Sequence, residues 1–387
     1  MSRLILVLLA AGLACGGTSH PRHDAGAADA VVDASLELAA SDVSTPIDRV
    51  DPVDAPPATP DVAGEGSGHP DAADAPADSV ADVADASDGA DADDPRCANL
   101  PGSSACVCDG FVMPNPAGAN LPNPARYEAA DGGVVVDDVS GLWWEAAASP
   151  SGMFTEPKAV EHCEALLLAG KSDWRVPSIF ELASIVDVTS KTSATPTAFD
   201  PPQPLSSWSS TLEANNFTGL GVGFKATAAE TFLVNSIDPM PVMCVRTGGA
   251  PPPRCYRAGA RYALDSTDVT TDLATGLAWR RHNQPNRTDW NSAKTACASL
   301  GGGWRLPSVH ELQTIVEHAR AVPQIDPTAF PGTPFITGLP DIVTISPFWT
   351  SSPDALDPTG QAWQVDFAGG YTDRVPVASL AWARCVR

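Results

Sequence analysis

The sequence has little positive charge and no long apolar run. Its 387 residues include 23 lysines and arginines against 47 aspartates and glutamates, for a formal net charge of −24. That balance argues against nucleic acid or another polyanion as the main partner. The apolar run Leu4–Ala11 is too short to cross a bilayer as a helix. The chain is nevertheless long enough for two or three domains with their own cores.

The sequence also lacks the short motifs of common catalytic and metal sites. It contains no G-x-S-x-G, no H-E-x-x-H and no phosphate-binding loop. Its seven histidines form no metal-binding set, and we expect His310 and His318, eight residues apart, at the surface. We therefore predict a protein that is not an enzyme and that uses neither a cofactor nor a metal ion.

The first residues have the pattern of an export signal. Arg3 precedes the apolar run Leu4–Ala11, and the run is followed by GLACGG at positions 12–17. A small residue followed by Cys15 resembles a bacterial lipobox, in which the chain is cut before the cysteine and lipid is attached to it. We expect removal of residues 1–14, lipid on Cys15 and an anchor in the outer membrane or at the cell surface. The alternative is an ordinary secretory signal in which Cys15 is incidental.

Residues 15–96 are almost devoid of large apolar side chains. They carry about 19 acidic residues against three arginines and no lysine, mixed with alanine and proline. Such a segment cannot bury enough surface to offset the entropy lost on ordering. We predict a disordered acidic tether that holds the rest of the protein away from a membrane. Calcium binding is the less favoured alternative, because the aspartates lack the spacing of a calcium loop.

From residue 125 the composition becomes globular and the chain repeats itself. The repeated phrases are WRVPSIFELASIV at 174–186 and WRLPSVHELQTIV at 304–316, GLWWE at 141–145 and GLAWR at 276–280, PTAF at 196–199 and 327–330, SWSS at 207–210 and FWTS at 348–351, and CVR at 244–246 and 385–387. Their common order indicates a tandem duplication, with units at 125–248 and 255–387. The second unit is longer between Phe330 and Trp349, where we expect a surface loop.

The thirteen-residue phrase predicts a capped helix in each unit. Ser178 and Glu181, like Ser308 and Glu311, form the S-x-x-E pattern of a capping box, and apolar residues follow at helical spacing. In a capping box the serine accepts from the third helical N–H, and the glutamate reaches back to the N–H of the serine. The phrase is therefore structural rather than catalytic.

The tryptophan and the arginine at the start of each repeated segment are expected to support the helix that follows. We expect Trp174 and Trp304 to cover its apolar face. We expect Arg175 and Arg305 to pair with an acid that the sequence does not identify.

The cysteines predict disulfides. Nine are present, and lipid on Cys15 would leave an even number, which in an exported chain indicates disulfides. A helix expected at 155–170 and its counterpart at 289–302 each contain one cysteine, and the last cysteine of each unit is duplicated too. We therefore predict the pairs Cys163–Cys244 and Cys297–Cys385. Three pairings remain open for Cys97, Cys106, Cys108 and Cys255, and Cys255 is a candidate to join the second unit to the segment 97–124.

The rest of each unit is predicted to consist of strands and loops. Residues 97–124, a cysteine-containing connector rich in Gly, Pro and Asn, are predicted to be loop. Hairpins are predicted at 132–146, 268–281 and 362–375, and a closing strand at 383–387. Each unit is thus an α+β domain.

These landmarks together resemble the Lcl C-terminal domain family. The likeness is carried by the D-x-x-[ST]-G-L-x-W hairpin, the helix with one cysteine, W-R-x-P-S-x-x-E-L, W-[ST]-S and the terminal C-V-R. It implies two tandem domains of a divergent C-type-lectin-like fold, whose long-range disulfide joins the first helix to the last strand. The E-P-N, Q-P-D and W-N-D motifs of calcium-dependent lectins are missing from the late loops, so the sequence does not predict calcium-dependent sugar binding. Gln284–Asn286 has a related sequence but precedes the first helix of its unit.

The sequence therefore favours a non-enzymatic envelope lipoprotein that presents two lectin-like modules to a glycan or protein ligand. Trp363 and Trp382, found only in the second unit, could stack on a sugar ring if they are exposed. The basic loop Arg280–Arg287 could meet an anionic glycan, although a solvated loop is the simpler interpretation. A structural part of an envelope assembly is the first alternative. An enzyme acting on envelope or exported peptides is the second.

Overall fold

The computed structural model describes residues 95–147, 152–199, 206–213, 218–224, 231–248, 250–339 and 342–387. The predictions made for residues 1–94, including the signal peptide, Cys15 and the tether, lie outside these ranges. Among the described helices, none has both the length and the apolar character needed to cross a membrane.

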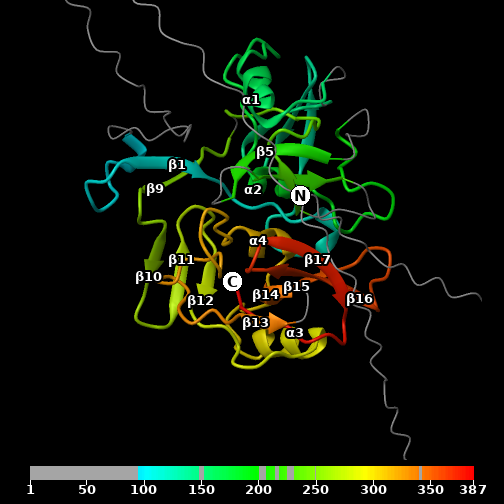
Figure 1. Ribbon diagram of the computed structural model, residues 1–387. Helices are drawn as coiled ribbons and strands as arrows, with labels where there is room; N and C mark the ends of the chain where they lie inside the picture. Colours follow the sequence, from blue (N-terminus) through cyan, green and yellow to red (C-terminus); the bar gives the residue numbers. More distant parts are fainter. Residues whose placement is uncertain are drawn as a thin grey trace, which may run out of the picture. The chain divides into compact units, whose positions relative to one another are not determined.

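The first repeat consists of two small antiparallel sheets and two short helices (Figure 1). One sheet contains β2 (Tyr127–Ala130), β3 (Val134–Asp137), β4 (Leu142–Glu145) and β8 (Val245–Thr247) in that order, and the other contains β5 (Ser206–Leu212), β6 (Thr218–Gly223) and β7 (Thr231–Asn235). The helices are α1 (Glu156–Glu164) and α2 (Ile179–Ser184). The predicted hairpin at 132–146 is the β3–β4 pair.

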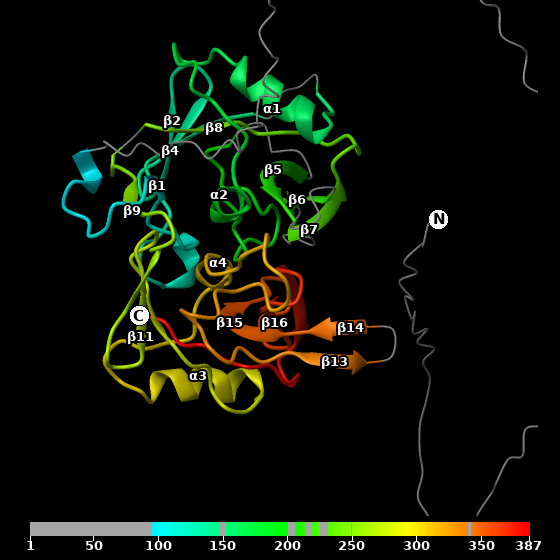
Figure 2. The same ribbon diagram turned by 60° about the vertical axis from the view of Figure 1, so that its left-hand side comes forward.

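The second repeat has the same order of elements up to its last sheet, but the closing strand predicted at 383–387 is absent: Val386 forms only isolated bridges, with Trp279 and Arg305. Its sheets are β10 (Tyr262–Leu264), β11 (Val269–Asp272) and β12 (Ala278–Arg280), then β15 (Pro347–Pro353), β16 (Gln361–Asp366) and β17 (Tyr371–Pro376), and its helices are α3 (Trp290–Ala298) and α4 (Val309–Gln313). Both predicted hairpins of this repeat are confirmed. The extra length forms a hairpin of its own, β13 (Ile336–Leu339) and β14 (Ile342–Ile345), which extends away from the β15–β16 pair in Figure 2.

The connector is more ordered than its composition predicted. After the single turn η1 (Pro95–Cys97), strand β1 (Cys106–Gly110) pairs antiparallel with β9 (Arg254–Arg257). A second turn, η2 (Ala117–Ala119), precedes the first repeat. The prediction that residues 97–124 form loop throughout was wrong for β1. The partner strand of β1 lies far along the chain, and the local composition of the connector does not indicate that pairing.

Four disulfides hold the described part of the chain together. Cys163–Cys244 and Cys297–Cys385 join the first helix of each repeat to its last segment, as predicted. Of the three pairings that remained open, the structure has Cys97–Cys106 and Cys108–Cys255. The second of these joins the connector to the start of the second repeat, as expected for Cys255.

The predicted capping boxes are present in both repeats. Ser178 Oγ accepts from the Glu181 N–H at 3.3 Å, and the Glu181 carboxylate accepts from the Ser178 N–H at 2.8 Å. Ser308 and Glu311 make the same two bonds at 3.0 and 2.9 Å. Both helices end sooner than the apolar pattern suggested. The apolar residues that follow α2 and α4 lie in a turn or directly after it but remain buried.

The tryptophans of the phrase do not cover these helices, contrary to prediction. Trp174 packs in a separate cluster with Ala159 and Cys163 of α1, and Trp304 packs with Trp290 and Cys297 of α3. The reason lies in the extended backbone before each helix. Arg175 forms a β-bridge with Val245, and side chains alternate along such a segment, so Trp174 faces the first helix and its disulfide.

The two repeats share one core and meet through equivalent elements. The apolar faces of α2 and α4 lie in the same cluster of buried residues, and both figures place these helices next to each other. Beside them β7 meets β17, where the Thr231 N–H donates to Thr372 Oγ1 at 3.0 Å and the Thr372 N–H donates to Thr231 Oγ1 at 3.2 Å. Reciprocal contacts between equivalent residues are the mark of a two-fold junction, here formed within one chain.

Candidate functional site

A cleft with a volume of about 1130 Å³ opens beside the capped helix of the first repeat. Its walls come mainly from the connector around β1, the segment 172–181 and the start of the second repeat, with contributions from α1, from Ser210 and from Thr314. Aromatic lining is provided by Phe111, Phe180, Tyr256 and Trp174. A concave site of this size, lined by both apolar and polar groups, has the features of a ligand-binding site.

An ion pair lies at the edge of the cleft, and both of its residues belong to the repeated segment 174–186. The Arg175 guanidinium donates to both carboxylate oxygens of Glu181, at 2.8 and 2.6 Å. Arg305 and Glu311 form the same bidentate pair, with both distances 2.6 Å. The acid that the sequence left unidentified is therefore the capping-box glutamate. The constant six-residue spacing from arginine to glutamate in both copies was the signal that could have found it.

The ion pair determines what Glu181 can do chemically. Burial alone raises the pKa of Glu181, but the Arg175 charge and the hydrogen bonds from Arg175 and Ser178 outweigh it and lower the pKa below its ordinary value. Glu181 therefore stays ionised and acts as a hydrogen-bond acceptor rather than as a general acid.

A second ion pair and a neutral hydroxyl group also line the cleft. Arg261 donates to both carboxylate oxygens of the buried Asp272, at 2.9 and 2.8 Å. Burial, together with the nearby Asp109 charge, raises the pKa of Tyr256 far above its ordinary value, so its hydroxyl is uncharged. The cleft therefore combines aromatic surfaces and neutralised ion pairs with the carboxylates of Asp109 and Glu164, an environment suited to a ligand of mixed polarity.

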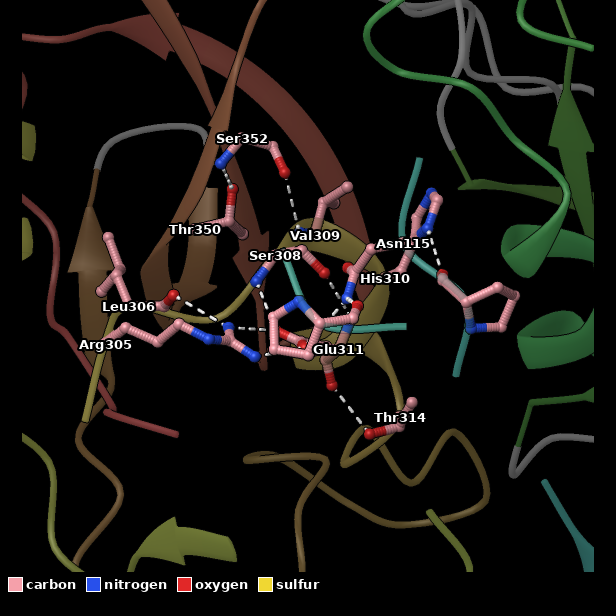
Figure 3. Close-up of polar contacts among 12 residues, drawn as sticks. Asn115, Arg305, Leu306, Ser308, Val309, His310, Glu311, Thr314, Thr350 and Ser352 are labelled. Atoms are coloured by element: carbon pink, nitrogen blue, oxygen red, sulfur yellow. Dashed lines mark hydrogen bonds and ion pairs between the residues drawn. The ribbon is translucent and has the colours of Figure 1, made fainter. Parts of the chain in front are cut away.

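The equivalent place in the second repeat is filled by the connector. Asn115 is fully buried and donates from Nδ2 to Glu311 Oε1 at 3.1 Å, as Figure 3 shows. His310 Nδ1 lies 3.2 Å from the carbonyl oxygen of Pro114. The first-repeat counterparts of His310 and Glu311 are Phe180 and Glu181, and both line the open cleft. Sequence reasoning did not find Asn115, and no local pattern in the connector distinguishes it.

The structure buries both histidines that were expected at the surface. His310 is 2% exposed and His318 is 5% exposed. Burial lowers both pKa values, that of His318 to about 4. The prediction was wrong because α4 is short and faces the first repeat, where Phe180 packs at 6.1 Å from the His318 ring. The connector covers His310 in addition, through the carbonyl oxygen of Pro114.

The two tryptophans proposed to stack on sugar are also buried. Trp363 is 1% exposed and Trp382 is 8% exposed, so the exposure that this prediction required is absent. The Arg374 and Arg287 guanidinium groups lie over their rings, at 5.3 and 5.5 Å from the centroids. Both indoles belong to the core of the second repeat.

The basic loop Arg280–Arg287 is partly neutralised by one acid. Asp268 contacts Arg280 at 3.0 Å and His282 at 2.5 Å. Arg281 instead donates to the carbonyl oxygen of Thr328. This arrangement reduces the charge left for an anionic ligand, so the simpler interpretation of a solvated loop is favoured.

Two groups of potential metal ligands occur among the described residues. The sulfurs of Cys97, Cys106, Cys108 and Cys255 lie within 4.8 Å of one another, but all four belong to disulfides. A disulfide sulfur is not the thiolate that binds metal. The other group consists of Glu145, His162 and Cys244, whose sulfur is in a disulfide as well.

Glu145 is expected to make the first repeat less stable as pH rises. Burial raises the pKa of Glu145 to about 7, although its carboxylate accepts from the Cys244 N–H at 3.2 Å. The folded state therefore holds the proton more tightly than the unfolded chain. The resulting stabilisation, roughly 3 kcal/mol, is complete below about pH 4.5 and is lost as pH rises through about 7. Glu145→Gln keeps an acceptor for Cys244 and cannot ionise, so it should melt at a higher temperature than the wild type at pH 8 but not at pH 4.5.

Thermal melts of both proteins across this pH range test the expectation. Glu128→Gln, an exposed position on β2, is the matched control and should leave the profile unchanged. A melting difference between wild type and Glu145→Gln that does not vary with pH would contradict the assignment.

Comparison with known proteins identifies the repeats. A search of curated proteins finds no match. The family model of the Lcl C-terminal domain matches the chain twice, over residues 133–246 and 268–387, which together make up more than half of its length. The two matches contain both capped helices, both long-range disulfides and the phrase that lines the cleft. The chain therefore belongs to the Lcl C-terminal domain family, of which it carries two tandem copies.

Proposed function

We propose that the chain is a non-enzymatic binding protein of the cell envelope, which presents two lectin-like modules to a glycan or protein ligand. The cleft beside Glu181 is its binding site. We further propose that lipid on Cys15 anchors the protein and that the acidic segment 15–96 separates the modules from the membrane. In this scheme the modules stand at the outer membrane or the cell surface.

The observation that carries the proposal is the cleft itself. It combines four aromatic side chains with hydrogen-bonding groups at its edge, the usual composition of a site that recognises polar ligands by contact. Glu181 is ion-paired and its pKa is lowered, which suits recognition better than proton transfer. The lectin-like part of the proposal is supported by the disulfide that links the first helix of each repeat to its last segment.

A binding screen with a cleft-blocking variant tests the proposal. The full chain would be applied to a broad glycan and polysaccharide array, with calcium and with chelator, and cross-linked to envelope proteins in parallel. Ser210 is exposed and lines the cleft, so Ser210→Trp should reduce binding of the true ligand by about tenfold or more. We expect the binding itself to resist the chelator.

Ser299→Trp is the matched control, because Ser299 is exposed at the end of α3 and does not line the cleft. It should bind like the wild type. Blank arrays together with no cross-linked partner would contradict the proposed function. Partners captured equally well by Ser210→Trp would instead favour a structural role in an envelope assembly.

A further inference from the structure

We propose that the open cleft of the first repeat binds an extended segment of a partner protein that presents an asparagine next to a proline. The connector of this chain already occupies the equivalent site of the second repeat in that manner. The inference rests on the proposed function and specifies the class of ligand. The chain therefore contains one filled and one open version of the same site.

The two sites are built alike beyond the shared phrase. In the first repeat the N–H of Ile179 donates to Thr211 Oγ1 at 3.0 Å, and in the second the N–H of Val309 donates to Ser352 Oγ at 3.1 Å. The bidentate ion pair and the capping box are present in both. A ligand group that fits against one glutamate should therefore find the same geometry at the other.

The filled site shows which groups fit. Asn115 Nδ2 donates to Glu311 Oε1 at 3.1 Å and to the carbonyl oxygen of Pro122 at 2.8 Å. The Asn115 N–H donates to the carbonyl oxygen of Asn123, which closes the loop behind the inserted side chain. The recognised group is a neutral carboxamide on a proline-flanked backbone, and it is buried completely against Glu311.

The open site retains the acceptor but has no such loop. Among the hydrogen bonds of the described residues, Glu181 receives those of Arg175 and Ser178, and no asparagine side chain donates to it. Its side chain is 5% exposed, against 1% for Glu311. Because Arg175 already neutralises Glu181, a further cation would add repulsion, and a neutral carboxamide donor is favoured.

Phe180 adds a preference that the filled site lacks. It replaces His310, whose ring contacts a backbone carbonyl oxygen, and it presents an aromatic surface to the cleft. An aromatic ring packs well against the apolar ring of a proline, which has no N–H to leave unpaired. The open cleft should therefore prefer proline beside the asparagine.

The occupant comes from another protein rather than from the amino-terminal part of this chain. Residues 1–94 contain neither asparagine nor glutamine and so cannot supply the carboxamide. The connector asparagines that are flanked by proline, Asn115 and Asn123, are both part of the loop at the second site. A partner with an exposed Pro-Asn-Pro segment has the required chemistry.

A peptide copied from the connector is the probe for this inference. Fluorescein-labelled peptide with the sequence of residues 112–125 would be titrated with the full chain and followed by fluorescence anisotropy. We expect saturable binding that weakens by about tenfold or more when the peptide carries Asn115→Leu, because the charge-assisted hydrogen bond is lost. Glu181→Gln, which replaces one acceptor oxygen by an NH2 group, should weaken binding to a similar degree.

Glu317→Gln is the matched control, since it makes the same change in an ion pair with Arg320 that does not line the cleft, and it should leave peptide binding unchanged. Ser210→Trp blocks the cleft without touching the capping box, so it tests the site even if Glu181→Gln proves unstable. Equal binding to the wild type and both cleft variants would overturn the inference, as would a loss of binding in Glu317→Gln as large as that in Glu181→Gln.

The remaining outcomes separate this inference from the proposed function. No peptide binding together with a glycan hit that Ser210→Trp abolishes would overturn the peptide assignment and leave the binding function intact. Self-association of the wild type that Glu181→Gln abolishes, measured by sedimentation velocity without peptide, would assign the cleft to the connector of a second copy and overturn the partner-protein assignment.

Discussion

Removing the Cys297–Cys385 disulfide by a double alanine substitution should destabilise the protein by about 4–5 kcal/mol. The bond closes a loop with a sequence separation of 88, and both sulfur-bearing residues are at most 1% exposed. In the chain-entropy model the unfolded state gains the freedom of that entire loop once the bond is gone. The substitution also removes contacts from the core around Trp290 and Trp304.

The Cys97–Cys106 disulfide provides the control for this experiment. Its sequence separation is only 9, so the same model gives a loss of about 2.5 kcal/mol for its double alanine variant. Urea unfolding followed by tryptophan fluorescence measures both losses. Equal losses for the two variants would show that loop length does not govern the contribution of these disulfides.

Replacing Glu311 by alanine should cost about 3–4 kcal/mol of unfolding free energy. Glu311 is buried and accepts from Arg305, from the Ser308 N–H and from Asn115. Alanine removes all of these acceptors at once, which leaves the Arg305 guanidinium at 21% exposure without its carboxylate partner. It also removes the glutamate part of the α4 capping box and the hydrogen bond that holds Asn115 of the connector loop.

An exposed ion pair with the same residue types is the comparison for this loss. Glu317 and Arg320 form an (i, i+3) pair in which both side chains reach solvent, and Glu317→Ala should cost at most about 0.5 kcal/mol. Chemical unfolding of the two variants measures the difference. A loss at Glu311 no greater than that at Glu317 would mean that burial and capping contribute nothing beyond an ordinary surface pair.

The repeated phrase acts as structural support in both repeats, and in the first repeat it also lines the proposed binding site. Its arginine, serine and glutamate build the start of a helix, and that task is identical at Glu181 and Glu311. The two sites differ in whether another segment covers the glutamate. The connector loop covers Glu311, whereas Glu181 stands at the edge of the cleft. Duplication followed by the blocking of one copy would leave a single specific site.

The sequence by itself determined the local and repeated features of this protein. The capping boxes follow from S-x-x-E ahead of an apolar pattern, because their bonds join residues three apart. The hairpins follow from short apolar strands separated by turn residues. The two long-range disulfides followed from the duplication, since equivalent cysteines must have equivalent partners in a repeated fold.

Only the tertiary structure decided which side chains are covered and which line a cavity. His310, Trp363 and Trp382 have no local signal for burial. The connector carbonyl of Pro114 contacts His310, and the two tryptophans lie in the core shared by both repeats. The pairing of β1 with β9 and the insertion of Asn115 against Glu311 are contacts of the same kind. Exposure depends on which surfaces meet after the chain has folded. The periodicity of a segment indicates which face is apolar but not what will pack against it.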